Sequence, residues 1–223
     1  CKFELFVSEN EAGSSEVYIM LWKIGKSISV QISNELLSIA LIPFLIKAFE
    51  SSALPAHGAA LPYLLSCVVP ILAFQTAATA LTAQCMGKES HGLVQRYQGI
   101  LIAMGTIIPL TLLVLSLVVP KFLAKPFMDL DDPSNNHTFD LFKTGLPIFL
   151  IGLTAEPARF VTSGTLRGIK DVVAPAKLAI GGTWLVGCVL ELLLPAAFNL
   201  GYKGIAIGRT TGLLIVSFML LHR

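Results

Sequence analysis

Glu35 stands in the middle of a long apolar run, where a carboxylate is unexpected and well placed to do chemistry. The apolar body of this run spans residues 28–46, close to the roughly 20 residues that a helix needs to cross the hydrocarbon core of a bilayer. A charged group at that depth costs roughly 2.5–3.5 kcal/mol on insertion scales, so it usually has a partner or a function. Glu35 is therefore the first candidate for binding a proton or a cation.

A second carboxylate, Glu156, lies inside a later apolar run at residues 146–161, together with Arg159. A buried carboxylate is costly when it is ionised and unpaired, so it takes up a proton, a metal cation or a cationic substrate, and the three can compete. We predict that Glu35 and Glu156 share an aqueous site for cation or proton coupling. An Arg three residues after a Glu is also within reach on one helical face, so a self-neutralising Glu156–Arg159 pair without a transport role stays an alternative.

Polar residues around the two carboxylates mark one wall of a predicted substrate cavity. At 3.6 residues per turn, the polar side chains near Glu35 fall on one stripe of its helix, and leucines and isoleucines occupy the other sides. The polar residues of the second apolar run are weaker candidates, because Ser and Thr in membrane helices more often join neighbouring helices. The predicted lining residues are Gln31, Asn34, Ser38, Arg159, Gln75 and Thr79.

Glu191 and the histidines are expected to lie outside the predicted cation site. Glu191 lies between two leucines in a helix that otherwise shows little polar stripe, so we expect it near the outer end of that helix, within reach of the lipid headgroups. The histidines, His57 among them, lie in or near predicted loops and are expected to be surface groups.

The composition excludes a soluble fold for the whole chain. Hydrophobic residues make up 54% and charged residues 13% of the sequence, whereas soluble domains average about 25% charged residues. We predict an all-α integral membrane protein with lipid as a partner, and a net charge of +2 gives no sign of a nucleic-acid partner. The sequence contains no HExxH, GxSxG or Gly-rich phosphate loop, so it indicates neither an enzyme nor a cofactor, and H⁺ or Na⁺ is the expected coupling ion.

Six apolar runs follow a polar and acidic beginning. Residues 1–20 are interpreted as a cytoplasmic linker and residues 21–223 as one transmembrane unit. The chain begins on Cys1 with no signal-peptide pattern, so we expect a fragment. The predicted helices span residues 22–48, 57–83, 97–119, 139–166, 172–198 and 203–221.

The charge distribution predicts the orientation of these helices. Six spans place both ends of the chain on one side of the membrane, and that side carries most of the Lys and Arg, including Lys88, Arg96 and Arg167. The third connection, on the opposite side, holds three Asp at residues 129–132. By the positive-inside rule, both termini lie in the cytoplasm and the protein crosses the cell membrane, a bacterial inner membrane or a plasma membrane.

A hairpin motif follows the fourth run. Residues 164–171 read Gly-Thr-Leu-Arg-Gly-Ile-Lys-Asp, and Pro175 comes shortly after. This pattern resembles the LRGxxD…P signature of multidrug and toxic compound extrusion (MATE) transporters. The resemblance implies a structural hairpin on the cytoplasmic side, formed by Gly164, Arg167, Gly168 and Asp171.

Further pieces extend this resemblance over about residues 21–223. Residues 21–25 (LWKIG) lie ten residues before Glu35, residues 53–57 read ALPAH, and Trp184 precedes the NLGYKGIAIG stretch at residues 199–208. The order is similar to that of the C-terminal half of NorM-like members. The family implies a twelve-helix antiporter built of two six-helix lobes, so this chain looks like the C-terminal lobe and its implied partner is the missing N-terminal six-helix lobe.

The resemblance also implies the activity. A NorM-like exchanger would exchange H⁺ or Na⁺ for small organic cations or drugs, with Glu35 and Glu156 at the acidic positions of the seventh and tenth helices. These two residues would ligate a metal only if the coupling ion is Na⁺. The family usually has Asp at the second position, and Arg159 beside it is unusual. This fixed charge would weaken a bound Na⁺ and could hold Glu156 ionised, leaving Glu35 to change protonation.

Two alternatives stay open. A flippase for a lipid-linked oligosaccharide, from the same superfamily, would need a cavity rich in Arg and Lys, for which this chain offers Arg159 and Arg209. A six-helix channel or scaffold subunit is the second alternative, although no charged or carbonyl-rich filter segment is present.

Overall fold

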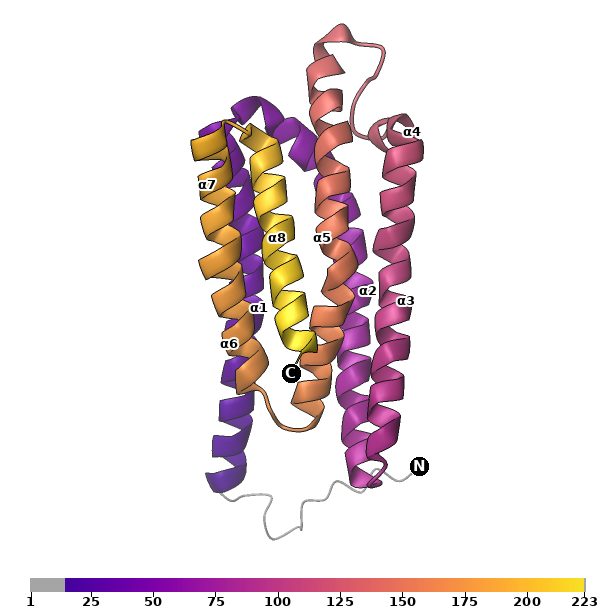
Figure 1. Cartoon of the computed structure of the whole chain (residues 1–223), viewed down its shortest axis with the longest axis vertical. Helices are drawn as coiled ribbons and strands as arrows, with labels where there is room; N and C mark the ends of the chain where they lie inside the picture. The colour runs from indigo at the N-terminus through magenta and orange to yellow at the C-terminus, as the bar shows by residue number, and fades with distance from the viewer. Residues whose placement is uncertain (1–14, 223) are drawn as a thin grey trace.

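The chain folds as a helical bundle in which consecutive spans run antiparallel in the computed structural model, which describes residues 15–222 (Figure 1). Six helical segments are long and apolar enough to cross a membrane. No strand occurs in that part of the chain, so the all-α membrane prediction is confirmed. The main helices are α1 (Ser15–Phe49), α2 (Leu54–Gly87), α3 (His91–Val118), α5 (Asn136–Gly168), α6 (Val173–Gly181), α7 (Val189–Phe198) and α8 (Gly201–Leu221).

Several helices, such as α1, α2 and α5, are longer than the apolar runs that predicted them. α1 begins at Ser15, so residues 15–20 of the predicted linker are helical, and the rest of that linker lies outside the described residues. No Pro or Gly lies between Ser15 and residue 22, where the predicted helix begins, so no local helix breaker stops α1 from starting earlier. Short turns complete the connections: η1 (Ser51–Ala53), α4 (Pro120–Ala124) and η2 (Pro133–Asn135).

The fifth span is interrupted by a π-helix. The segment η3 (Gly182–Cys188) joins α6 to α7 in one continuous rod (Figure 1). A π-helical turn widens the helix and leaves its backbone hydrogen bonds in a different register, and such turns are frequent at functional sites. The sequence did not predict it.

α5 is the central helix of the bundle and packs against α2, α3 and α8. Two hydroxyl groups of α8 donate hydrogen bonds to carbonyl oxygens of α5: Thr210 to Ile148 at 2.7 Å and Ser217 to Ala155 at 3.0 Å. Both pairs advance by seven residues, two helical turns, which fits the parallel course of α5 and α8 in Figure 1. In lipid, polar bonds of this kind hold helices together where the hydrophobic effect cannot.

The apolar core lies at the end of the bundle where α1 turns into α2. It includes Ile46, Ala60, Phe142 and Tyr202, all fully buried. Glu50, after α1, accepts a hydrogen bond at 2.7 Å from the backbone N–H of Tyr202 in the first turn of α8. A carboxylate at a helix N-terminus satisfies an otherwise unpaired N–H and the helix dipole.

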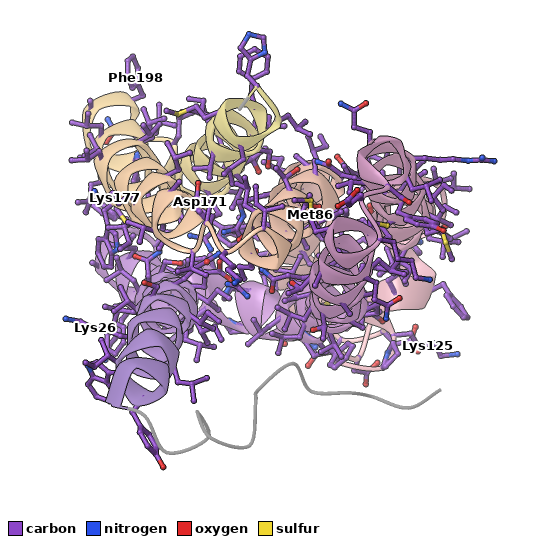
Figure 2. All side chains as sticks on the ribbon, turned by 90° about the horizontal axis from the view of Figure 1, so that it is seen from below. Lys26, Met86, Lys125, Asp171, Lys177 and Phe198 are labelled. Atoms are coloured by element: carbon purple, nitrogen blue, oxygen red, sulfur yellow. The ribbon has the colours of Figure 1, made fainter. Side chains whose placement is uncertain are left out.

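Away from this core, the outer surface of the bundle is covered by large apolar side chains, among them Phe44, Leu117 and Phe218. Figure 2 shows the helices from one end, with long side chains such as those of Lys26 and Lys125 at the periphery. An apolar outer surface of this kind is the one that lipid or a neighbouring membrane helix covers.

Candidate functional site

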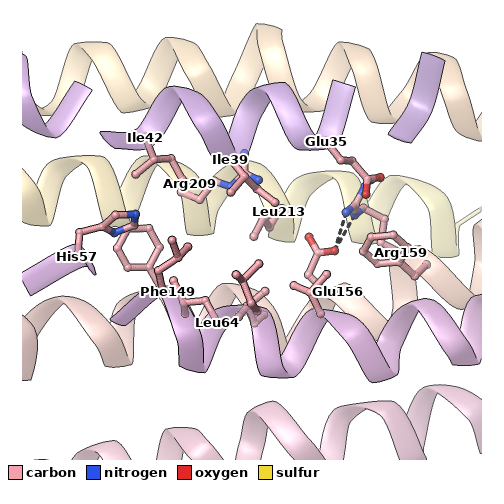
Figure 3. A pocket seen from close by; sticks show the side chains of 15 residues that line it. Glu35, Ile39, Ile42, His57, Leu64, Phe149, Glu156, Arg159, Arg209 and Leu213 are labelled. Carbon is pink, nitrogen blue, oxygen red and sulfur yellow. Dashed lines mark hydrogen bonds and ion pairs between the residues drawn. The ribbon is translucent and has the colours of Figure 1, made fainter. Parts of the chain in front are cut away.

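The two predicted carboxylates meet on one guanidinium. Arg159 Nη1 donates a hydrogen bond to Glu35 Oε1 at 2.7 Å, and Arg159 Nη2 and Nε donate to Glu156 Oε2 at 2.6 and 3.2 Å (Figure 3). The guanidinium carbon also lies 4.3 Å from the ring centroid of Phe160. We call Glu35, Arg159 and Glu156 the carboxylate–arginine cluster. It joins α1 to α5 and carries a formal charge of −1 when both carboxyl groups are ionised.

The two carboxylates differ in exposure and in the number of bonds. The side chain of Glu156 is 3% exposed and accepts two hydrogen bonds from Arg159, its neighbour on α5. The side chain of Glu35 is 16% exposed and accepts one, across the gap between two helices. The Glu156–Arg159 pair expected from their spacing therefore forms, but it does not use all of the guanidinium's donors. Glu35 is the more loosely held and more accessible carboxylate.

A second polar chain connects α1 to the end of α5. Gln31, one turn before Glu35, accepts a hydrogen bond at 2.7 Å from Arg167 Nη2 and donates one at 3.3 Å to Ser163. Arg167 is also close enough to Glu35 for a favourable charge interaction. The arginine of the hairpin motif is thus tied to the same helix face that carries Glu35.

The other motif residues shape the hairpin itself. A Cβ at Gly164 would collide with the backbone oxygen of Gln75, and one at Gly168 would lie 2.6 Å from the Cβ of Thr82. These glycines let α5 and α2 approach closely. Asp171 accepts a hydrogen bond at 3.2 Å from the backbone N–H of Ala174, in the first turn of α6.

The predicted lining residues separate into two groups. The first group lies on α1, buried on the same side as Glu35, and consists of Gln31, Asn34 and Ser38. Each of these side chains is held by another contact. Asn34 accepts a hydrogen bond from the indole N–H of Trp184 in η3, and Ser38 donates one to the carbonyl of Glu35. Gln75 and Thr79 lie where α2 packs on α5, and Thr79 donates to the Gln75 carbonyl. Among the predicted residues, the open cavity is lined by Glu35, Glu156 and Arg159.

This cavity runs along the bundle between α1, α2, α5 and α8 (Figure 3). Its carboxylate–arginine cluster lies towards one end, His57 and Phe149 lie at the other, and Arg209 projects between them. Leucine and isoleucine side chains form most of the remaining wall. The cavity volume is about 70 Å³, well below the roughly 300–1,000 Å³ of sites that enclose drug-sized ligands.

His57 was wrongly predicted to be a surface group. It is 2% exposed and lies against the rings of Phe149 and Tyr202, with centroid distances of 5.6 and 6.1 Å. The reason is that α2 begins at Leu54, before the apolar run becomes evident, so the first turn of the helix enters the core.

The expectation for Glu191 was also wrong. Its side chain is 0% exposed, so it is enclosed by protein rather than open to the outside of the bundle, and its Oε1 lies 3.8 Å from Arg209 Nη1 on α8. The partner is 18 residues later on another span, and no periodic pattern in the sequence indicated it.

A comparison with known families decides the membership of the chain. The family model MatE matches residues 27–193, a segment that contains the whole carboxylate–arginine cluster. The chain belongs to the MatE family. The resemblance to MATE transporters is thereby confirmed, and the six long apolar helices of the described residues fit a multi-pass membrane protein.

Curated relatives agree with this membership. The chain is 28% identical over 222 residues to the probable multidrug resistance protein NorM of Agrobacterium fabrum. The matched region covers 100% of this chain and 48% of that protein. It is 27% identical over 206 residues to the probable multidrug resistance protein NorM of Brucella suis, covering 92% and 44% of the two chains. The chain therefore spans about half the length of the curated relatives it matches.

Solved structures show the same fold. An outward-facing multidrug resistance MATE family transporter superposes with a TM-score of 0.84 and 17% identity, covering 97% of this chain and 48% of that one. An inward-facing MATE transporter gives a TM-score of 0.79 at 17% identity, covering 94% and 47%. A superfamily transporter from Pyrococcus furiosus gives 0.83 at 18% identity, covering 97% and 48%. The six helices thus have the arrangement of one half of such transporters.

Proposed function

We propose that this chain is one six-helix lobe of a secondary multidrug exporter, which exchanges H⁺ or Na⁺ for organic cations. The observation that carries the proposal is the sharing of Arg159 by Glu35 and Glu156 at the edge of a cavity. One guanidinium neutralises one carboxylate charge, so the cluster holds one excess negative charge when both acids are ionised. That charge attracts a proton, a metal cation or a cationic cargo, and competition among them gives exchange.

Glu35 is the group that changes partner in this mechanism. Glu156 is the more buried carboxylate and accepts two hydrogen bonds from Arg159, its neighbour on the same helix. Glu35 accepts only one hydrogen bond from Arg159, and its exposure gives a proton or a cargo ammonium access from the cavity. Protonation of Glu35 releases the cargo, and return of the cargo displaces the proton.

We favour H⁺ over Na⁺ as the coupling ion in this lobe. Arg159 fills the space between the two carboxylates, so Na⁺ would have to displace a guanidinium that makes three hydrogen bonds. No group of three or more His, Cys, Asp or Glu side chains within residues 15–222 is arranged to hold a metal ion. A proton needs only one oxygen of Glu35.

The cargo site is completed by the other lobe. The cavity in this chain is large enough for only a few water molecules. The chain also matches only about half the length of each relative. A six-helix partner lobe facing α1, α2 and α8 would close the cavity around an organic cation. We further propose that both ends of this chain face the cytoplasm of the cell that carries it, following the Lys and Arg distribution.

Replacement of Glu35 by Gln in the full-length protein tests the proposal. The amide keeps the shape of the side chain but cannot take up a proton, so we expect pH-driven efflux of a cationic dye from cells to be lost, while the amount of protein in the membrane is unchanged. Asp140→Asn, at an exposed position of α5, is the matched control and should export normally. Normal efflux by Glu35→Gln would refute the role of this carboxylate.

The flippase alternative is not favoured. The two curated relatives described above are NorM proteins. Both arginines near the cavity already face carboxylates: Arg159 faces Glu35 and Glu156, and Arg209 faces Glu191. They are poorly placed to bind a pyrophosphate, because each would first have to leave an acidic partner.

A further inference from the structure

Glu191 is a carboxylate with no hydrogen bond. Both of its oxygens are buried, and neither accepts a bond from any described residue. Its only ion-pair partner in the described part of the chain is Arg209, at 3.8 Å, which is beyond hydrogen-bond distance. An ionised carboxylate in these surroundings is poorly stabilised, because a single charge at that distance does not replace the donors that water would provide.

The backbones around Glu191 leave little room for a different arrangement. A Cβ at Gly208, the residue before Arg209, would lie 2.5 Å from the backbone nitrogen of Glu191, so α7 and α8 are in direct contact here. The π-helix η3 ends at Cys188, three residues before Glu191. The acid is therefore fixed in place, and the flexible member of the pair is the long side chain of Arg209.

Arg209 connects this buried acid to the transport cavity. Its side chain is 12% exposed and lines the same cavity as Glu35, Glu156 and Arg159 (Figure 3). Its charge can thus be directed either towards Glu191 or into the cavity.

The other titratable groups near Glu191 are few. The packed elements are α8, η3 and α1. α8 contributes Arg209, and η3 contributes the buried thiol of Cys188. The charged α1 residues with described side chains, Lys26, Glu35 and Lys47, form no ion pair with Glu191.

We propose that Glu191 is a second protonation site, separate from the carboxylate–arginine cluster, and that its proton determines whether Arg209 presents its charge to the cavity. When Glu191 is ionised, Arg209 is attracted to α7 and the pair is neutral. When a proton binds a Glu191 oxygen, Arg209 keeps its charge and has no acidic partner. The positive charge of Arg209 then acts on the cavity and disfavours an organic cation. A low pH outside the cell, which protonates Glu191, therefore assists cargo release. This role rests on the proposed exchange function, whereas the protonation of Glu191 does not.

Infrared difference spectroscopy of the purified full-length protein tests the protonation directly. A pH step should produce a signal from the C=O stretch of a protonated carboxyl group, and this signal should be lost in Glu191→Gln. In Arg209→Gln, the same signal should persist to higher pH, because removal of the nearby positive charge favours the protonated acid. The control, Asp140→Asn, should leave the signal unchanged. Identical spectra for the unmodified protein and Glu191→Gln would overturn the proposal.

The transport measurement separates this proposal from the proposed function. We expect Glu191→Gln to export dye with a flattened pH dependence, whereas Glu35→Gln exports none. An unaltered pH profile in Glu191→Gln would overturn the link between Glu191 and exchange. Absence of efflux from the unmodified protein would instead refute the exporter, and the infrared signal would still report on Glu191.

Discussion

Arg159 holds two acids that would otherwise face each other across the gap between α1 and α5. Its three hydrogen bonds reach two carboxylates, and its side chain is 6% exposed. Removing one member of a buried ion pair leaves an uncompensated charge, which is more damaging than the pair itself is stabilising. The arginine therefore matters for folding as well as for exchange.

Arg159→Gln is expected to lower the free energy of unfolding by about 3–5 kcal/mol, measured by thermal unfolding of the purified full-length protein. Arg159→Lys should retain part of the stability, because an ammonium keeps the charge but cannot form the same planar set of bonds. Adding Glu35→Gln to Arg159→Gln should restore part of the loss, since one of the two unpaired acids is then neutral.

Arg96→Gln is the control for the Arg159 series, since Arg96 is exposed and its loss should change stability by less than about 0.5 kcal/mol. Equal unfolding temperatures for Arg159→Gln and Arg96→Gln would contradict the bridging role.

At the scale of the elements, α5 packs closely against its neighbours because it presents small residues to them. Gly145, Gly164 and Gly168 each face a group that a Cβ would displace: the ring of Tyr202, the Gln75 carbonyl and the Thr82 side chain. Pro147 and Pro157 lie within the helix, which membrane helices tolerate because neighbouring groups can satisfy the backbone. The approach of α5 to α2 also sets where Glu156 and Arg159 lie.

Gly164→Val is expected to separate α5 from α2, because its side chain would meet a backbone oxygen that cannot move aside. The cost of such overpacking is about 1–3 kcal/mol, and thermal unfolding of the full-length protein measures it. Gly99→Val, in α3 where an added Cβ meets nothing within 4 Å, provides the comparison. A loss of stability no larger than that of Gly99→Val would show that the α2–α5 contact is not as tight as described.

At the scale of the whole molecule, the lobe has two ends of different charge. The α2–α3 and α5–α6 connections lie at the end where α1 begins, and the α1–α2, α3–α5 and α7–α8 connections lie at the other (Figure 1). The first end carries Lys88 and Arg167, and the second carries Asp129, Asp131 and Asp132.

Single cysteines at the two ends provide a test of orientation. We expect Asp131→Cys in the full-length protein to react with a membrane-impermeant maleimide added to intact cells, and Lys88→Cys to react only after the membrane is made permeable. Both positions are exposed, and the native Cys67, Cys85 and Cys188 are buried, so the unmodified protein gives the background. The opposite pattern would reverse the proposed topology.

The sequence was sufficient for the six spans and the family, because apolar runs and the hairpin motif are local signals. It also singled out Glu35, Glu156 and Arg159, since charges in apolar runs are rare, although their roles stay predictions. It did not indicate that His57 is buried or that Glu191 faces Arg209, because both depend on contacts between distant segments. Nor did it indicate η3, because a π-helical turn changes the backbone hydrogen bonds without changing the apolar composition.

The seven-residue step shared by Thr210, Ser217 and their α5 acceptors has a consequence for motion. A shift of α8 along α5 by one helical turn would break both hydrogen bonds together. We therefore expect α5 and α8 to move as a rigid unit. α1 is held differently along its length. Near Pro43, Ile42, Leu45 and Ile46 pack into the apolar core, whereas the earlier half of the helix is held by hydrogen bonds of Gln31, Asn34 and Glu35. A change in the tilt of that half would break these hydrogen bonds, so we expect the tilt of α1 to depend on whether Glu35 keeps its bond to Arg159.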